Sequence, residues 1–165
     1  MHKSDNEIAL MQGAMNMTLA VHQATASMLY AGISTIEVEA FIKLAHQKVG
    51  APGNYFCIVL FGIATSFPHG VKDAQVLKKG DVILIDTGCK VHDYLSDITR
   101  TYIFGEPTTR QRQFWNTEKS AQLAAFNAAQ IGVPCEEVDG AARSYLASQG
   151  LGPEYQTPGC PHRTG

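Results

Sequence analysis

The chain has 165 residues, of which 45% are hydrophobic and 17% charged, and its formal net charge at pH 7 is −2. This composition is typical of a folded globular protein and argues against intrinsic disorder. The near-neutral charge gives no electrostatic reason to expect binding to nucleic acid or to an anionic membrane. No apolar run approaches the roughly 20 residues of a membrane helix, and the polar N-terminus lacks the apolar core of a signal peptide. We therefore expect a cytoplasmic protein.

Two helices are predicted at the start of the chain. Ser4 and Glu7 have the spacing of a capping box, and apolar residues then recur at helical intervals up to about Gly32. Ser34 and Glu37 form a second capping box. The helix that this second box starts is expected to end at Gly50.

Three strands are predicted next. Residues 55–61 are rich in β-forming side chains and are bounded by glycines. Residues 81–86 are apolar on both faces, which predicts a central strand. The third strand is expected over 94–104. A loop at 66–70 follows the first strand and contains a histidine between proline and glycine.

The helical pattern returns after the third strand. Thr108 and Gln111 have capping-box spacing and start a long Ala-rich helix that is expected to end near Gly132. Pro134 suits the first turn of a fourth helix, which is expected to end near Gly150.

An internal repeat links the two helical regions. Residues 32–38 resemble residues 132–138, at an offset of 100. In both copies a glycine separates a long Ala-rich helix from a shorter helix, which favours an internal duplication. Three predicted strands follow the short helix of the first copy, whereas the sequence continues for only about 15 residues after that of the second.

The four cysteines give little information about function. Cys57, Cys89, Cys135 and Cys160 are widely separated and form no C-x-x-C pair. A zinc ribbon or a thioredoxin-like site is therefore not expected. We expect reduced thiols, as in most cytosolic proteins.

Two aspartates frame a predicted hairpin between the second and third strands. With a turn centred at 91–92, Asp86 and Asp97 would lie directly opposite each other, with their Cβ atoms about 4.5–5.5 Å apart. Carboxylates this close repel each other unless a cation lies between them, and a divalent metal suits an all-oxygen site. Two metal ions about 3.5–4 Å apart would also fit. Alternatively, Asp86 shapes a strand end, and Asp97 caps a backbone amide or pairs with Arg100.

The sequence around these aspartates resembles a known family. Residues 80–88 followed by 94–101 are similar to the paired-aspartate hairpin of the pita-bread metallopeptidases, which include methionine aminopeptidases, Xaa-Pro aminopeptidases and prolidases. The Ser-Asp-Ile-Thr-Arg-Thr sequence at 96–101 is closer to the proline-specific branch. Residues 67–70 resemble the segment that carries the family's substrate-side histidine. Residues 158–165 resemble the start of its His-Arg-Thr-Gly-His-Gly segment.

The resemblance implies an α+β pita-bread fold, of which residues 1–165 would form a partial catalytic domain. A first α-α-β unit would cover about 4–105, and the opening helices of a second unit would cover about 108–165. One departure from the family is Asp93, which stands where a hairpin glycine is common. Aspartate tolerates the left-handed backbone conformation, so the hairpin stays plausible.

The resemblance also implies a set of site residues. Asp86 and Asp97 would be metal ligands, with Asp97 bridging two divalent ions; Mn is favoured, with Co and Zn as alternatives. His69 and His162 would be catalytic residues that contact the substrate. The remaining ligands of the family, one histidine and two glutamates, would fall after Gly165.

The implied function is hydrolysis of an Xaa-Pro peptide bond by metal-activated water. The substrate would be a peptide with proline at the second position, and the parent protein would be a homodimer. Because three of five expected ligands are absent, residues 1–165 alone should be inactive. Two alternatives remain open: a non-catalytic member of the fold that binds peptides or partners, and a hydrolase of a non-peptide C–N bond, as creatinase is.

Overall fold

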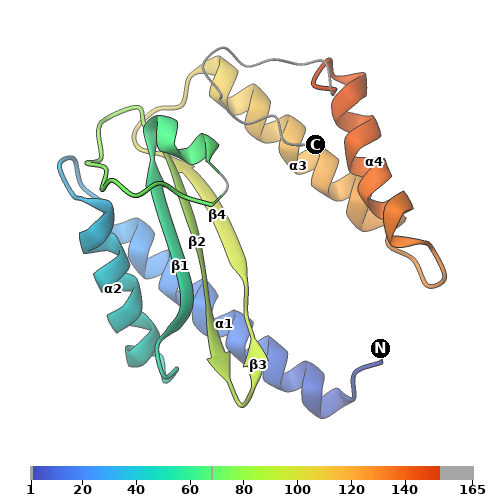
Figure 1. The fold of residues 1–165 in the computed structure, drawn as a ribbon, viewed down its shortest axis with the longest axis horizontal. Coiled ribbons are helices and arrows are strands. Elements are labelled where there is room, and N and C mark those ends of the chain that lie inside the picture. Colours follow the sequence, from blue (N-terminus) through green and yellow to red (C-terminus); the bar gives the residue numbers. More distant parts are fainter. Residues whose placement is uncertain (1, 68, 153–165) are drawn as a thin grey trace. The chain divides into compact units, whose positions relative to one another are not determined.

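A computed structural model of the chain describes residues 2–67 and 69–152 (Figure 1). The chain divides into two units, Met1–Glu106 and Pro107–Gly165. The first unit contains two helices and a small antiparallel sheet, and the second contains two further helices. Among the described residues, each helix is too short or too polar to span a lipid bilayer.

The two helices of the first unit begin at the predicted caps. Helix α1 spans Asp5–Met28 and helix α2 spans Thr35–Lys48. Both N-caps, Ser4 and Ser34, accept a hydrogen bond from the glutamate amide three residues later, and that glutamate side chain bonds back to the cap. These capping boxes satisfy amides that a helix start leaves without partners. Both predicted boxes are therefore confirmed.

The sheet is antiparallel and is built around one central strand. Strand β2 pairs with each of the other three strands, so the predicted central position is confirmed. The strands are β1 (Asn54–Phe61), β2 (Val82–Val91), β3 (Tyr94–Leu95) and β4 (Ile98–Ile103).

Two strand predictions need correction. Strand β2 continues to Val91, well beyond the predicted end at Asp86. The single strand expected over 94–104 is interrupted at residues 96–97, which separate β3 from β4. The interruption lies at Asp97, where the sequence predicts a metal ligand, so the backbone there departs from regular strand geometry.

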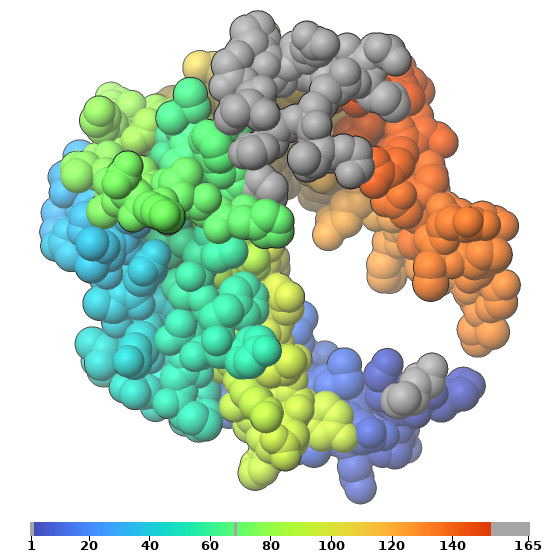
Figure 2. Space-filling view, viewed as in Figure 1, coloured from blue at the N-terminus to red at the C-terminus, as the bar shows by residue number. Residues whose placement is uncertain are grey.

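Helices α1 and α2 cover one face of the sheet. Helix α1 crosses behind the strands, and α2 lies along β1 (Figure 1). Alternate residues of β2 point to this covered face, and Ile83 and Ile85 are almost fully buried there. They pack with Val38 and Ile42 of α2 and with Val21 of α1. Figure 2 shows atoms of β1 and of the β2–β4 hairpin, in green to yellow, at the surface of this unit.

The second unit contains α3 (Thr109–Ala128) and α4 (Cys135–Ser148). The predicted capping box at Thr108 is confirmed. The prediction that Pro134 lies in the first turn of α4 is wrong. Pro134 is the N-cap of this helix, because its ψ of 142° is not helical. The helix therefore starts one residue later and has no side-chain cap.

Candidate metal centre

The hairpin turn fixes the positions of both predicted metal ligands. His92 and Asp93 form the turn with φ values of +47° and +67°, and Val91 pairs with Tyr94. A two-residue turn with two positive φ values suits the twist of an antiparallel hairpin. The turn therefore lies at 92–93, one residue later than the predicted 91–92. Histidine and aspartate both tolerate the left-handed conformation that this turn requires.

This turn changes the partner of Asp86. Asp86 pairs with Thr99 and not with Asp97, so the predicted direct opposition of the two aspartates is wrong. The pairing shifts by two residues, and a shift of two keeps every side chain on its face. Asp86 and Asp97 therefore share a face as diagonal neighbours, a relationship that typically spans about 7–8 Å.

Thr99 is a site residue that the sequence analysis missed. Its hydroxyl donates a hydrogen bond of 2.8 Å to Oδ1 of Asp86. The contact fixes one carboxylate oxygen of Asp86, which is itself half-buried. The correct turn would have revealed the pair, because Thr99 is then the cross-strand partner of Asp86.

The carboxylate of Asp97 is exposed, and its side chain makes no hydrogen bond or ion pair with another described residue. Arg100 donates to the carbonyl of Thr99 at 2.8 Å, and over residues 2–67 and 69–152 no ion pair joins it to Asp97. The alternative that Asp97 serves to pair with Arg100 is therefore wrong. The backbone beside Asp97 also lies close to β2. A Cβ added at Gly88 would overlap the carbonyl oxygen of Ser96.

The tip of the hairpin is tied to its surroundings by side chains. Lys90 and Asp93 form an ion pair of 2.8 Å across the turn, and the hydrogen bond and charge of Lys90 lower the pKa of the Asp93 carboxyl. The Tyr94 hydroxyl donates to Oε1 of Glu7 on α1 at 2.9 Å. These contacts help to hold the turn between the two predicted ligands.

His69 lies on an exposed turn that follows the short 3₁₀ helix Gly62–Ser66. Its neighbour Gly70 has a φ of +80°, and a Cβ added there would lie 4.0 Å from Cγ2 of Ile58. Ile58 is the β1 partner of Asp86. The His69 turn therefore passes over the strand position next to Asp86.

The other predicted site residue, His162, lies outside the described residues. Within the described ranges, no group of three or more His, Cys, Asp or Glu residues is arranged to hold a metal ion. The described part of the chain therefore offers Asp86 and Asp97 as an incomplete set of oxygen ligands.

Thiol chemistry does not account for the site. Cys57, Cys89 and Cys135 are free, and Cys160 is outside the described residues. Burial raises the pKa of Cys57 to about 12, so its thiolate is scarce near neutral pH. Cys89 is fully buried on the helix side of the sheet, whereas Cys135 is exposed at the start of α4.

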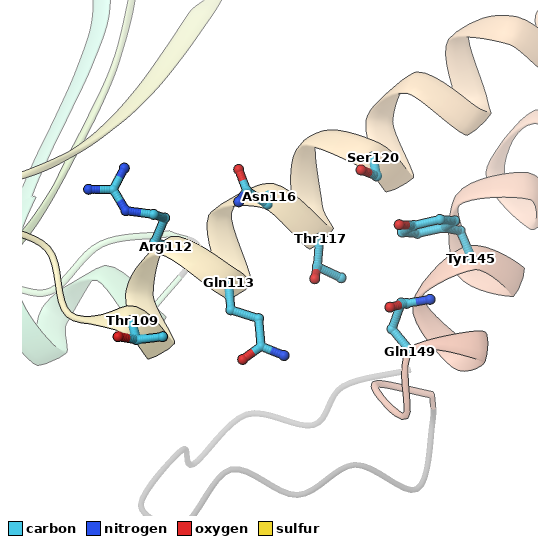
Figure 3. A pocket seen from close by; sticks show the side chains of 8 residues that line it. All are labelled: Thr109, Arg112, Gln113, Asn116, Thr117, Ser120, Tyr145 and Gln149. Atoms are coloured by element: carbon cyan, nitrogen blue, oxygen red, sulfur yellow. The ribbon is translucent and has the colours of Figure 1, made fainter.

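The second unit contains a shallow polar groove of about 440 Å³ between α3 and α4 (Figure 3). Among the described residues, its lining carries hydroxyl and amide groups and one guanidinium group, without a carboxylate, an imidazole or a thiol. The described lining therefore lacks the charged and nitrogen ligands that transition metals prefer. The residues that line it are Thr109, Arg112, Gln113, Asn116, Thr117, Ser120, Tyr145 and Gln149.

Comparison with known proteins identifies the family. Residues 9–165 match the model of metallopeptidase family M24. The chain is 37% identical over 165 residues to "Putative dipeptidase YkvY" of Bacillus subtilis, covering 99% of this chain and 44% of that protein.

Solved structures agree with this assignment. The Xaa-Pro dipeptidase from Bacillus anthracis superposes with a TM-score of 0.86 at 33% identity, covering 91% of this chain and 42% of that one. The X-Pro aminopeptidase from Thermotoga maritima gives a TM-score of 0.87 at 31% identity, covering 91% and 43%. The chain thus spans less than half the length of each of these three proteins. It belongs to metallopeptidase family M24 and has the first part of the pita-bread fold of the prolidases and aminopeptidases.

Proposed function

We propose that this chain is part of a peptidase that hydrolyses the bond before proline in a peptide with proline at the second position. The observation that carries the proposal is the diagonal pair of aspartates on the uncovered face, with Thr99 holding Asp86. The similarity to an Xaa-Pro dipeptidase and an X-Pro aminopeptidase supports the substrate class. The division into two units supports a first α-α-β unit over about 4–105 and the start of a second over about 108–165.

A metallopeptidase family implies divalent ions, and the residues present fit that implication in part. Asp86 and Asp97 offer carboxylate oxygens, which suit hard divalent cations, and the fold makes no ion pair with either in the described residues. We propose that Asp86 and Asp97 would together help to hold a pair of divalent ions, with Mn favoured over Co and Zn. Bound ions would supply Lewis acidity to the peptide carbonyl.

The chain's own side chains would have distinct roles. The Thr99 hydroxyl fixes one oxygen of Asp86, which orients the carboxylate before a metal arrives. His69, on the turn that passes over Ile58, would donate a hydrogen bond to the substrate carbonyl oxygen. We propose a substrate contact for His162 as well. The homodimer and the cytoplasmic location stay predictions.

The metal site is tested by measuring Mn²⁺ binding to a chimera in which the second half of the Bacillus anthracis enzyme supplies the ligands that residues 1–165 lack, with free Mn²⁺ followed by electron paramagnetic resonance. Asp86→Asn and Asp97→Asn should each weaken binding at least tenfold, because each removes a charged ligand. Asp93→Asn is the matched control, since Asp93 is an exposed carboxylate on the same hairpin that pairs with Lys90. Equal weakening by all three substitutions would contradict a specific site and indicate general charge attraction.

The reaction is tested with Ala-Pro, Ala-Ala and creatine in the presence of Mn²⁺. We expect residues 1–165 alone to cleave none of them, because two carboxylates are too few to hold two ions. A chimera completed with the second half of the Bacillus anthracis enzyme should cleave Ala-Pro. Cleavage of creatine in place of Ala-Pro would reassign the reaction to another C–N bond. Peptide binding without cleavage would favour a binding protein.

A further inference from the structure

Asp97 lies in the gap between β3 and β4, just after a backbone hydrogen bond of 2.9 Å from the amide of Ser96 to the carbonyl oxygen of Cys89 on β2. Strand β3 ends at Leu95, and β4 begins at Ile98. The neighbours of Asp97 behave differently from Asp97 itself. Ser96 and Ile98 are 1% and 5% exposed, whereas Asp97 is exposed. The backbone at 96–98 therefore buries alternate side chains and directs the aspartate to the opposite face.

Helix α1 holds the residue before Asp97. Thr18 is fully buried, and its Oγ1 lies 2.8 Å from Oγ of Ser96. The same Ser96 oxygen accepts a hydrogen bond of 2.9 Å from the backbone amide of Cys89 on β2. Ser96 is thereby attached to a helix on one side and to the central strand on the other.

The hydrogen bonds of His46 set the direction of this chain of contacts. His46 is fully buried on α2, and its Nδ1 lies 3.0 Å from the carbonyl oxygen of Ile42. A carbonyl can only accept, so Nδ1 carries the proton and Nε2 of the neutral ring accepts. Thr18, 3.1 Å from Nε2, therefore donates to His46, and its oxygen is an acceptor for Ser96, whose hydroxyl also lies 3.3 Å from the carbonyl oxygen of Cys89.

Helix α1 also holds the residue after Asp97. His22 is 3% exposed, and its Nε2 donates to the carbonyl oxygen of Ile98 at 2.9 Å. His22 follows Thr18 by four residues, so both side chains lie on the same face of α1, one turn apart. One helix face therefore contacts both neighbours of Asp97.

We propose that Thr18 and His22 are positioning residues that hold Asp97 at the metal site through Ser96 and Ile98. Neither side chain reaches the site face, so each acts only through the backbone that carries the aspartate. The proposal deepens the proposed function and rests on it for the metal part of the test. The backbone part of the test stands without any metal.

The test compares Thr18→Val with Thr25→Val. Both threonines are fully buried on α1, but the Thr25 hydroxyl donates at 2.8 Å only to its own helix, at the carbonyl of Val21. The first measurement is amide hydrogen exchange at Cys89 and Ser96, relative to the core amide of Val59. Thr18→Val should lower relative protection at these two amides at least tenfold, whereas Thr25→Val should leave it within twofold.

The second measurement is the affinity for Mn²⁺ of the chimera that carries the missing ligands. Thr18→Val should weaken binding about 10- to 100-fold, as expected for a residue that orients a ligand, and Thr25→Val should not. Thr18→Ser keeps the hydroxyl and should restore both readouts. His22→Phe should resemble Thr18→Val, and His22→Gln, which keeps an N–H donor, should be closer to the parent chain. If Thr18→Val does not fold, Ser96→Ala removes the same hydrogen bond from its other end, and only the Ser96 amide is then compared, because this variant also removes the acceptor of the Cys89 amide.

Two outcomes would overturn the proposal. Equal exchange in Thr18→Val and Thr25→Val would mean that the hydroxyl does not hold the segment. Failure of Thr18→Ser to restore protection would show that the hydroxyl alone does not hold the segment. A failed metal site is recognised separately, because Asp97→Asn would then leave Mn²⁺ binding unchanged while the exchange comparison still decides the positioning role.

Discussion

The two helix pairs of the chain are alike in local structure and differ in burial. Helices α2 and α4 each contain 14 residues, at an offset of 100, and Gly32 and Gly132 precede them with φ values of +98° and +90°. Helix α2 has five buried residues, whereas α4 has none among the described residues. The local sequence thus determines where a helix lies, and a packing partner determines how much of it is buried.

The largest expected difference between the pairs concerns an equivalent valine. Val38 on α2 is 0% exposed, and Val138, its counterpart on α4, is half-buried. Val38→Ala should lower the unfolding free energy by about 2 kcal/mol, because it removes buried methyl groups and leaves a cavity. Val138→Ala should cost about 0.5 kcal/mol. Native-state hydrogen exchange measures each unit separately. Equal costs would contradict the comparison, because α4 would then be as buried as α2.

The helix starts were predictable because their causes lie within a few residues of sequence. Ser4, Ser34 and Thr108 are each followed three residues later by a glutamate or glutamine, and all three boxes form. The central place of β2 was also predictable from its apolar run. Pro134 was placed wrongly by one residue, because the φ of about −65° that the proline ring fixes leaves ψ free to be extended, as it is at this cap.

The candidate site was predictable only as far as its face. Side chains alternate between the two faces of a strand, which places Asp86 and Asp97 on the same face of the sheet. The pairing register, however, depends on which two residues of the turn adopt positive φ values. That choice hid the contact between Thr99 and Asp86. The hydrogen bond between Thr18 and Ser96 joins residues 78 positions apart, so no local pattern predicts it.

A smaller effect is expected from exchanging the caps of the two short helices. Ser34→Ala should cost about 1 kcal/mol, because it leaves the amide of Glu37 without its cap. Pro134→Ser would give α4 the same serine-to-glutamate spacing, with Glu137 in place of Glu37. Its gain should be less than about 1 kcal/mol, because loss of the proline ring makes the unfolded chain more flexible. A loss of α4 protection in Pro134→Ser would show that the repeats differ in backbone as well as burial.

The smallest expected difference is in pH dependence. Burial lowers the pKa of His46 and of His22, so the first unit holds both rings neutral. An unfolded histidine takes up a proton near pH 6.5, and the folded one only at lower pH. The unfolded state therefore binds more protons in this window, and the stability of the first unit should fall as pH decreases below about 6.5. Residues 107–152, which include α3 and α4, contain no histidine, so the stability of these two helices should lack this component.

Hydrogen exchange between pH 7.5 and 5 tests this difference, after correction for the intrinsic pH dependence of exchange. His46→Gln keeps a donor and an acceptor but does not titrate, so it should reduce the slope of stability against pH in the first unit. His22 should supply the slope that remains. An unchanged slope in His46→Gln would mean that His46 does not contribute to it. The buried His46 ring would then have to take up a proton in the folded state while it contacts Thr18 and Ile42. A protonated ring has no acceptor nitrogen, which contradicts the acceptor role of Nε2 that follows from the contact between Nδ1 and the carbonyl of Ile42.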